Sequence, residues 1–349
     1  MKTKEFEDNL ALFERYLDSF SIWESFREKR ILITGGKGTI GTALIILFLL
    51  ADRKFGLGLR LFASTRNPAA VPDHIEPTDP IVWMEHGREE EALSGERVDY
   101  IVHAACPTDR NFFRDHPATT YLTILHDTER MLKLAREKSA TMLFMSSDAE
   151  FGSISNDEPV DGDFYGPLDP LNSRSCYPLG KKSSVYLCHA FAEEFDVDVR
   201  MVRLSIVTGL FQRYDDPKVM SYFLRCLCEK KNIVLNTAGE TEKQILFSLD
   251  AAAACLFVLL FGERGRVYNA TNPDICMSIR DFAEHLVERF GEGKLKVEYR
   301  LLDEKSAGFA SPSQLRMSAE GLIALGWKPL VSLDEIFSID IERMTRGEN

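Results

Sequence analysis

Residues 30–51 read RILITGGKGTIGTALIILFLLA, and the class of fold follows from this stretch. It begins as a short apolar strand, turns on glycines at positions 35, 38 and 41, and continues as a long apolar helix pattern. Bare backbone at such a strand-to-helix turn approaches a pyrophosphate closely, and the N–H groups and dipole of the helix attract its negative charge. The spacing and its context therefore predict a dinucleotide site at the start of a βαβ unit.

Strand patterns alternate with helical patterns along the rest of the first 207 residues. Further strands are expected at residues 59–64, 81–84, 100–104, 142–146 and 199–204. Helical patterns at residues 119–138 and 181–195 separate the later strands. This alternation predicts an α/β fold in which a Rossmann-like, doubly wound parallel sheet carries the glycine turn.

The sequence divides into an N-terminal helix and two lobes. Residues 1–28 are expected to form an amphipathic helix that docks on the main body or on a second subunit. Its apolar residues recur at steps of four and three, at Phe6, Leu10, Phe13, Leu17 and Phe20. Residues 29–207 are expected to form the dinucleotide-binding domain, to which residues 240–262 return, and residues 208–239 and 263–349 a smaller, mixed α/β lobe that binds substrate. The later elements are expected at residues 218–230, 233–235, 248–261 and 279–290.

The composition is that of a globular protein, with 349 residues of which 45% are hydrophobic. Its 42 Lys and Arg against 54 Asp and Glu give a net charge of −12, which disfavours nucleic acid as a partner because that binding needs clustered cations. The longest apolar runs, residues 43–50 and 251–261, are shorter than the about 20 residues that cross a bilayer, so no membrane association is expected. Seven scattered cysteines without zinc-site spacing predict reduced thiols, no metal and a cytoplasmic location.

The end of the second expected strand bears on the choice between NAD and NADP. It reads LFASTRNP at residues 61–68, with Ser64, Thr65 and Arg66 and no carboxylate. An NAD site usually places a carboxylate here on the ribose hydroxyls, whereas a hydroxyl and a guanidinium suit a 2′-phosphate. The sequence favours NADP over NAD; the alternative is that Arg66 is a solvated side chain.

The heptapeptide CYPLGKK at residues 176–182 places Tyr177 and Lys181 four residues apart, on one face of a helix. A nearby ammonium and the positive charge of an oxidised nicotinamide favour the phenolate, so the pKa of Tyr177 is expected to fall toward working pH. Tyr177 would then serve as a general base toward a sugar hydroxyl or as an acid toward a ketone. Upstream, MLFMSSDAEFG at residues 142–152 ends a strand, where Ser147 is placed to share the substrate proton.

These motifs together resemble the extended short-chain dehydrogenase/reductase family of nucleotide-sugar epimerases, dehydratases and decarboxylases. The resemblance runs from about residue 29 to 329, and rests on TGGKGTIG (34–41), DYIVHAA (99–105), SSDAEFG (146–152), the Tyr177 and Lys181 pair, and LGWKP (325–329). The segment DPLNSRSCYPLGK (169–181) is similar to the branch that holds UDP-glucuronate decarboxylases and related enzymes of bacterial polysaccharide biosynthesis. The resemblance implies a homodimer that pairs through the helices at residues 119–138 and 181–195.

The resemblance also assigns roles to individual residues. Ser147, Tyr177 and Lys181 match the catalytic residues, and Asp148 matches the general acid of the dehydratases. The expected cofactor-binding residues are Gly35, Gly38, Thr39, Ile40, Gly41, Ser64, Arg66, His103, Ala104, Ala105, Tyr177 and Lys181. The residues expected to bind a nucleotide-sugar substrate are Thr108, Ser147, Asp148, Arg203, Lys243 and Arg316.

The sequence departs from the family pattern at several positions. The glutamate that takes the C5 proton or assists decarboxylation in the family is Ala149 here, and strand alternation points the neighbouring Glu150 to the other face. Four further positions hold a different residue from the one the family has. Ile124 stands where the family has an asparagine, and Leu204 where it has the proline of an R-P motif. Lys243 stands where the family has an arginine that contacts the diphosphate, and His86 where it has an aspartate on the adenine side of the cofactor. The aspartate that follows the diphosphate arginine is retained as Asp250.

Three functions remain open. In the first, Tyr177, Lys181 and Ser147 run reversible hydride transfer at C4 of a nucleotide-linked sugar, as an epimerase, ketoreductase or dehydrogenase; the absent glutamate favours this function. In the second, Asp148 supports a 4,6-dehydratase or decarboxylase with Glu150 rearranged as the base. In the third, the protein reduces another small carbonyl compound, or is a catalytically inactive cofactor-binding partner subunit.

Overall fold

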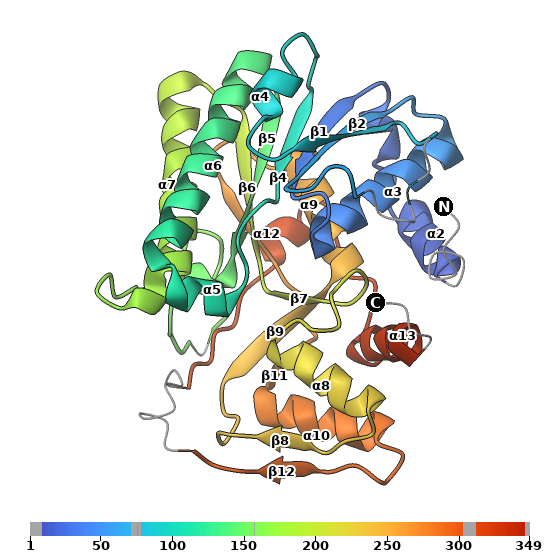
Figure 1. The fold of residues 1–349 in the computed structure, drawn as a ribbon, viewed down its shortest axis with the longest axis vertical. Helices are drawn as coiled ribbons and strands as arrows, with labels where there is room; N and C mark the ends of the chain where they lie inside the picture. The colour runs from blue at the N-terminus through green and yellow to red at the C-terminus, as the bar shows by residue number, and fades with distance from the viewer. Residues whose placement is uncertain (1–8, 71–74, 76–77, 157, 303–311, 346–349) are drawn as a thin grey trace.

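A seven-stranded parallel sheet carries the glycine turn in the computed structural model of the protein (Figure 1). The structure describes residues 9–70, 75, 78–156, 158–302 and 312–345. The strands of this sheet are β1 (Arg30–Thr34), β2 (Arg60–Thr65), β3 (Ile81–Glu85), β4 (Tyr100–His103), β5 (Thr141–Ser147), β6 (Val199–Leu204) and β10 (Val267–Ala270). Their spatial order, β10-β6-β5-β4-β1-β2-β3, confirms the predicted doubly wound sheet. The winding reverses between β1 and β4, and open α/β sheets bind ligands at such a point, outside the carboxyl ends of the strands.

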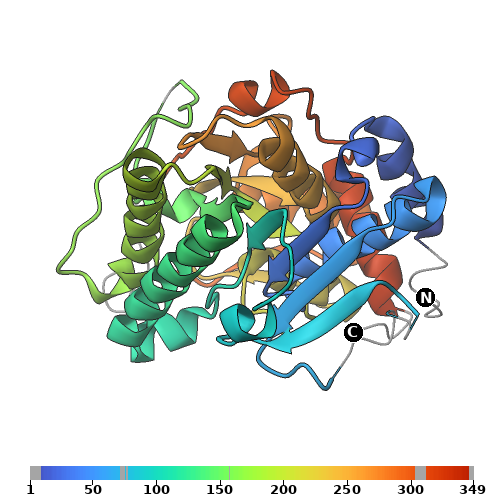
Figure 2. The ribbon, with the colours of Figure 1, turned by 90° about the horizontal axis from the view of Figure 1, so that it is seen from above.

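Alternate residues of β1 face opposite sides of the sheet and enter different hydrophobic cores. The covering helices are α3 (Thr39–Phe55), α6 (Pro117–Lys138), α7 (Cys176–Phe195) and α9 (Ser248–Phe261). Ile31 and Ile33 join the core on the side of α3 and α9, whereas Leu32 joins the core on the side of α6 and α7. Figure 2 shows α6 and α7 side by side on their face of the sheet. A strand covered on both faces is apolar along its length, which explains the sequence RILIT.

Helices α3 and α9 are apolar around most of their circumference because protein covers them on every side. Their buried residues include the uninterrupted runs 41–51 and 248–259. Helices of this kind belong either to a bilayer or to the core of a large domain. Within the described ranges no helix is long and apolar enough to cross a membrane, and both helices lie in the protein core.

The N-terminal segment docks on the main body of the protein. Helix α2 (Leu10–Ser19) and the 3-10 turn η1 (Trp23–Phe26) lie against α3. Phe13, Leu17 and Phe20 are buried there. The helix covers ten residues rather than the whole of the expected range 1–28, and Phe6 lies outside the described residues.

Asp250, buried at the start of α9, joins three segments that are distant in sequence. Its Oδ1 accepts hydrogen bonds from Tyr16 Oη at 2.7 Å and from the Leu330 N–H at 2.8 Å. Its carbonyl oxygen accepts from Trp327 Nε1 at 3.1 Å. Burial raises the pKa of Asp250 to about 7. The retained aspartate therefore holds α2 and the C-terminal GWKP segment against α9.

The smaller lobe lies below the main sheet in Figure 1. It contains a three-stranded sheet, β11-β9-β7, and a two-stranded sheet, β12-β8. The strands are β7 (Ile206–Thr208), β8 (Ile233–Leu235), β9 (Glu242–Phe247), β11 (Cys276–Ser278) and β12 (Val297–Tyr299). The later helices are α8 (Val219–Cys228), α10 (Ile279–Phe290), α12 (Glu320–Ile323) and α13 (Leu333–Thr345). The short helices of the larger lobe are α4 (Glu89–Ala92), α5 (Arg110–Asp115), η2 (Asp148–Phe151) and η3 (Ser173–Ser175).

The two lobes exchange segments at boundaries that differ from the expected ones. Strand β10, within the stretch 263–349 expected for the smaller lobe, completes the main sheet beside β6. Strand β9, within the stretch 240–262 expected to return to the main sheet, belongs to the small sheet, and only α9 returns. Strand β10 reads VYNA, and four residues with an asparagine give too weak a pattern to place a strand from sequence.

Candidate active site

The glycine loop between β1 and α3 leaves bare backbone at the carboxyl edge of the sheet. Gly35 has a φ of +68°, and a Cβ added there would lie 2.9 Å from the backbone N and Cα of Ala105. A Cβ added at Gly41 would lie 2.3 Å from the carbonyl oxygen of Gly35. Gly38 is the N-cap of α3, and no side chain in the described part of the protein caps this helix. The loop therefore fits a pyrophosphate, which would accept hydrogen bonds from the uncapped N–H groups.

The first turn of α3 faces the smaller lobe. Thr39 Oγ1 donates a hydrogen bond to the carbonyl oxygen of Phe211 at 3.3 Å, in the segment that follows β7. Ile40, the next residue, is partly buried against the core. The glycine loop thus lies at the junction of the two lobes.

His103, expected to line the cofactor, lies behind the glycine loop. Its Nδ1 is 2.9 Å from Thr34 Oγ1, and Thr34 Oγ1 accepts the Ala105 N–H at 3.0 Å. Burial above all, together with the charge of Lys181, lowers the pKa of His103 to about 3, so the imidazole is neutral. With 2% of its surface exposed, His103 supports the Ala104–Ala105 backbone rather than contacting a ligand itself.

The end of β2 presents one of the two expected cofactor side chains. Arg66 is exposed, whereas Ser64 is fully buried. Lys37, within the glycine loop, reaches the same place: its Nζ donates to the carbonyl oxygen of Asn67 at 2.5 Å and to that of Ala70. Lys37 was not among the expected cofactor residues, although its position inside the TGGKGTIG motif is a signal that the sequence contains.

His86, which replaces the adenine-side aspartate, belongs to a network of charges after β3. Its Nδ1 lies 3.0 Å from Glu89 Oε1, and its Nε2 lies 3.0 Å from Asp127 Oδ2. Arg130 pairs with both carboxylates. The hydrogen bonds with Asp127 and Glu89 raise the pKa of His86 to about 9, so the imidazole is protonated at neutral pH.

Tyr177 lies in the first turn of α7, partly buried, with its ring stacked on Phe113 at 4.8 Å between centroids. Burial raises the pKa of the phenol well above its usual value, and a hydrogen bond with Ser147 opposes the rise. Three acidic neighbours raise the pKa further: Cys106, Asp148 and Glu150. In the protein alone the pKa of Tyr177 is therefore raised, whereas the predicted fall included the charge of an oxidised nicotinamide.

Lys181 lies one helical turn after Tyr177 and is 5% exposed. Its Nζ donates to the carbonyl oxygen of Met145 at 2.6 Å and lies 4.9 Å from the centre of the Phe144 ring. Burial raises the pKa of the Cys106 thiol, and the charge of Lys181 lowers it. Sequence reasoning missed Cys106, which directly follows the HAA motif and lies near both catalytic candidates.

Ser147 and Asp148 follow one another at the carboxyl end of β5. Ser147 Oγ donates to Asp148 Oδ1 at 3.0 Å and accepts the Ala149 N–H at 3.2 Å, so it is the N-cap of η2. Both side chains are partly exposed. Because Ser147 also hydrogen-bonds Tyr177, the structure brings together the hydroxyl and the phenol that the sequence selected.

Glu150 and Arg203 form a buried ion pair on the inner side of η2. Arg203 Nη2 lies 3.2 Å from Glu150 Oε2, and the side chains are 0% and 1% exposed. The other Glu150 oxygen accepts a hydrogen bond from Ser146. The expected substrate contact of Arg203 and the alternative role of Glu150 as a base stay predictions, and this buried pairing does not favour either of them. A buried charge needs an opposite charge beside it, and these two residues satisfy each other.

The other expected substrate contacts lie apart from one another. Thr108 is exposed just before α5. Arg316 is exposed and pairs with Glu242 through two contacts of 3.0 and 3.2 Å. Lys243 is the next residue of β9, so it points to the opposite face of the strand from Glu242. The structure therefore does not bring Lys243 and Arg316 together as one diphosphate site.

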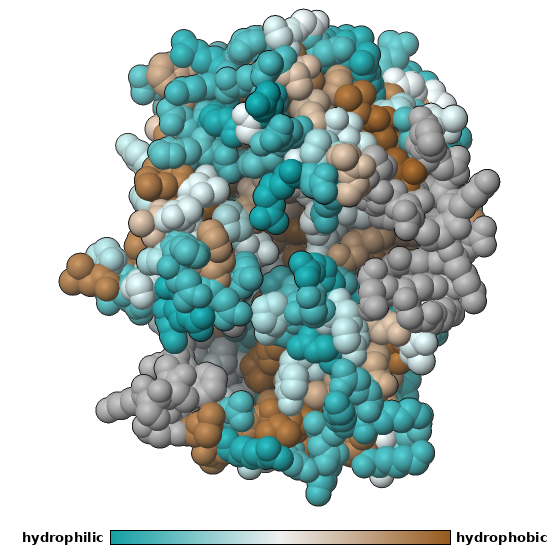
Figure 3. Space-filling view, in the orientation of Figure 1, coloured by the Kyte–Doolittle hydropathy of each residue, from teal (hydrophilic) through white to brown (hydrophobic). Residues whose placement is uncertain are grey.

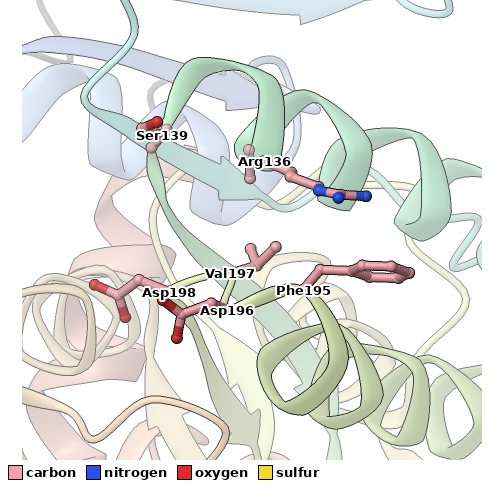
Figure 4. Close-up of a pocket in the computed structure, with 8 residues that line it drawn as sticks. Arg136, Ser139, Phe195, Asp196, Val197 and Asp198 are labelled. Carbon is pink, nitrogen blue, oxygen red and sulfur yellow. The ribbon is translucent and has the colours of Figure 1, made fainter.

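The face shown in Figure 3 is hollowed near its centre, at the level where the two lobes meet. A separate depression of about 250 Å³ lies between the carboxyl ends of α6 and α7. Figure 4 shows Arg136 and Phe195 beside it, and the guanidinium lies 4.3 Å from the centre of the ring. This depression is at the amino ends of β5 and β6, opposite to the edge that carries Tyr177 and Ser147, so it is not the candidate active site.

Solved structures of known proteins share this fold. A dTDP-glucose 4,6-dehydratase of Bacillus anthracis in complex with NAD matches with a TM-score of 0.75 and 18% identity, over 92% of this chain and 97% of that one. A UDP-glucose 4-epimerase of Thermotoga maritima with UDP-glucose matches with a TM-score of 0.75 and 19% identity, over 92% and 100%. At these identities the likeness shows the Rossmann-like α/β fold alone.

Sequence comparison gives the family. UDP-glucuronic acid decarboxylase 6 of Arabidopsis thaliana is 26% identical over 317 residues, which cover 88% of this chain and 86% of that protein. The model of the NAD dependent epimerase/dehydratase family matches residues 31–271. That span contains the glycine loop, the end of β5 and the Tyr177 and Lys181 pair. The resemblance to the extended short-chain dehydrogenases is thus confirmed, and the chain belongs to the NAD dependent epimerase/dehydratase family.

Proposed function

We propose that this protein transfers a hydride to and from C4 of a nucleotide-linked sugar, as an NAD(P)-dependent epimerase or reductase. The observation that supports the proposal is the meeting of Tyr177, Ser147 and Lys181 at the carboxyl edge of the sheet that carries the glycine loop. A nucleotide-sugar epimerase and a dehydratase share its fold, which supports the substrate class.

The side chains divide the chemistry among them. When bound at the glycine loop, a nicotinamide cofactor supplies the acceptor or donor of the hydride. Tyr177 takes the proton of the C4 hydroxyl as that carbon is oxidised and returns it on reduction. Ser147 hydrogen-bonds the same oxygen and orients the phenol. Lys181, one helical turn away, would add positive charge that favours the phenolate. Burial acts in the opposite direction and raises the pKa of Tyr177.

A second candidate function is decarboxylation or 4,6-dehydration. The curated UDP-glucuronic acid decarboxylases at 26% identity favour it. Asp148, partly exposed at the start of η2, would serve as its general acid. The base is the difficulty, because Ala149 has no carboxylate and Glu150 is paired with Arg203. The geometry therefore supports hydride transfer without elimination better than either of these reactions.

We also infer a preference for NADP over NAD. Arg66 is exposed at the end of β2, and Lys37 reaches the carbonyl oxygens of Asn67 and Ala70 in the segment that follows. Two cations at the place where an NAD site carries a carboxylate support binding of a 2′-phosphate.

A homodimer through α6 and α7 is a further part of the proposal. Leu122 on α6 is 46% exposed and Tyr186 on α7 is 72% exposed, so both helices present large apolar side chains outward. Sedimentation of the double variant Leu122→Glu with Tyr186→Glu tests it: a monomer is expected, and an unchanged dimer or a monomeric wild type would contradict it.

The function is tested with a panel of nucleotide sugars and both oxidised cofactors, followed by the masses of the products. We expect an isomer of unchanged mass or a product that has lost two hydrogens, whereas loss of water or carbon dioxide would support the second candidate. Tyr177→Phe should lower kcat by about 100- to 10,000-fold and leave cofactor binding intact. Full activity of that variant would refute the role of the phenol.

A further inference from the structure

The ion pair of Glu150 and Arg203 lies against the turn that carries Ser147 and Asp148. Glu150 is two residues beyond Asp148 in η2, so its side chain is anchored in the same short turn. Both carboxylate oxygens are used, one by Ser146 at the end of β5 and one by Arg203 Nη2 at 3.2 Å. Side chains of β5 and β6 therefore hold the turn from its buried side.

Arg203 extends these contacts to two further parts of the larger lobe. Its Nη1 donates to Asn269 Oδ1 in β10 at 3.0 Å and to the carbonyl oxygen of Gly162 at 3.2 Å. Asn269 Nδ2 in turn donates to the carbonyl oxygen of Val160 at 3.0 Å. One guanidinium thus connects η2, two strands and the segment at residues 160–162.

Aromatic rings enclose the guanidinium. It lies 4.5 Å from the centre of the Phe151 ring and 5.5 Å from that of Tyr165. Phe151 stacks on Phe164 with 5.8 Å between centroids. Gly166 approaches the same turn so closely that a Cβ there would lie 1.9 Å from the carbonyl oxygen of Phe151. The turn therefore has little room to move while the ion pair is in place.

We propose that Glu150 and Arg203 are positioning residues, which set where Ser147 and Asp148 lie relative to Tyr177. The kinetic part of this proposal rests on the proposed function. A buried ion pair adds little to stability compared with apolar residues of similar size. Its directional contacts, in contrast, hold one arrangement, because the guanidinium fork fits its acceptors only in a fixed orientation.

The decisive variant replaces both charges, as Glu150→Leu with Arg203→Met. It leaves no unpaired buried charge, so it is expected to fold with a Tm close to that of the wild type. We expect kcat to fall about 10- to 100-fold, since a misplacement of about 1 Å has an effect of that size, while KM and the cofactor Kd stay within about twofold. A crystal structure of the variant should show Ser147 and Asp148 displaced from Tyr177 by about 1 Å.

The control is the ion pair of Arg53 and Asp79, far from these residues in sequence, with side chains that are 41% and 3% exposed. Arg53→Met with Asp79→Leu should keep the kcat of the wild type. A folded Glu150→Leu, Arg203→Met variant with wild-type kcat and an unmoved turn would overturn the proposal.

A second variant, Arg203→Lys, tests the proposal if the double variant Glu150→Leu with Arg203→Met does not fold. Arg203→Lys keeps the charge but loses the fork, so one ammonium cannot replace the contacts to Glu150, Asn269 and Gly162 together. We expect a smaller loss of kcat with KM unchanged, and wild-type kcat with an unmoved turn would again overturn the proposal. If the wild type turns over no nucleotide sugar, the proposed function fails, and the position of the turn in the crystal structures alone decides the positioning role.

Discussion

Two regions at the carboxyl edge of the same sheet are built in opposite ways. The glycine loop between β1 and α3 takes its shape from backbone, since a Cβ at Gly35 or Gly41 would collide with neighbouring main-chain atoms. The turn after β5 takes its shape from side chains, above all from Glu150 and Arg203. The first region is sensitive to the size of a residue, and the second is sensitive to its charge.

The difference suggests how the two regions share the work of the site. The loop offers N–H groups, which every residue except proline has, and so depends little on which side chains surround it. The turn offers a hydroxyl, a carboxyl group and a fixed geometry, all of which change with single substitutions. We therefore expect changes at positions such as Ala149 to alter the reaction while the cofactor stays the same.

Among the variants that test the contrast between loop and turn, the largest effect is expected from adding one methyl group to the loop. In Gly41→Ala the new Cβ meets the carbonyl oxygen of Gly35, so the loop must shift. Overpacking of this kind costs about 1–3 kcal/mol, and we expect cofactor affinity to fall by up to about 100-fold in a fluorescence titration. Gly95→Ala, where a Cβ meets open space, is the control. Equal cofactor affinities of Gly41→Ala and Gly95→Ala would contradict the idea that backbone shape alone sets the glycine loop.

The charges around His86 provide a second region built from side chains, and its stability should depend on pH. Hydrogen bonds with Asp127 and Glu89 raise the pKa of His86 from 6.5 to about 9 in the folded protein. The stabilisation is therefore present below pH 6.5 and is lost as the pH rises through about 9, on the order of 3 kcal/mol. Urea unfolding of the wild type should show this loss, and His86→Asn should not. The same dependence of the unfolding free energy on pH in the wild type and in His86→Asn would contradict the prediction.

The preference for NADP tests whether the side chains of Arg66 and Lys37 contribute to cofactor binding beyond the backbone of the glycine loop. Removal of a cation from the 2′-phosphate site, in Arg66→Ala or Lys37→Met, should weaken NADP binding about tenfold, the size of one charge-assisted hydrogen bond. NAD binding should stay nearly constant, because NAD has no phosphate at that position. Calorimetry with both cofactors measures the ratio, and a parallel loss for NAD would show that the side chains only hold the loop in shape.

The smallest effect is expected on the pH profile. Burial raises the pKa of Tyr177, and the carboxylate of Asp148 is among the groups that raise it further. Asp148→Asn removes that negative charge, so the pKa falls and the limb of kcat/KM that reports the phenolate moves to lower pH, by up to about one unit. The exposed pair of Arg213 and Asp215 supplies the control, Asp215→Asn, which should leave the limb in place. A shift to higher pH would contradict the assignment.

The region built from backbone could be predicted from the sequence in most of its detail. The glycines, the strand before them and the helix after them lie within 26 residues, and strand β6 and helices α9 and α10 have the predicted bounds. The separation of Tyr177 and Lys181 by one helical turn was also a local pattern. Each of these features depends on residues that are close in sequence, where periodicity carries the information.

The region built from side chains could not be predicted in the same way. Arg203 and its partner Glu150 are 53 residues apart, and Asn269 is 66 residues beyond Arg203. No local pattern shows that such charges share one buried position, so the pairing of Arg203 could not be predicted from the sequence. The burial of Ser64 and His103 could not be predicted either, because it depends on distant segments.

Asp250 receives hydrogen bonds from Tyr16, 234 residues before it, and from Leu330, 80 residues after it. This contact cannot close on a ribosome until residue 330 has left the exit tunnel, however early the sheet begins to form. Nascent chains that stop short of that residue are thus expected to leave Asp250 without the hydrogen bond from the Leu330 N–H and to remain susceptible to proteases.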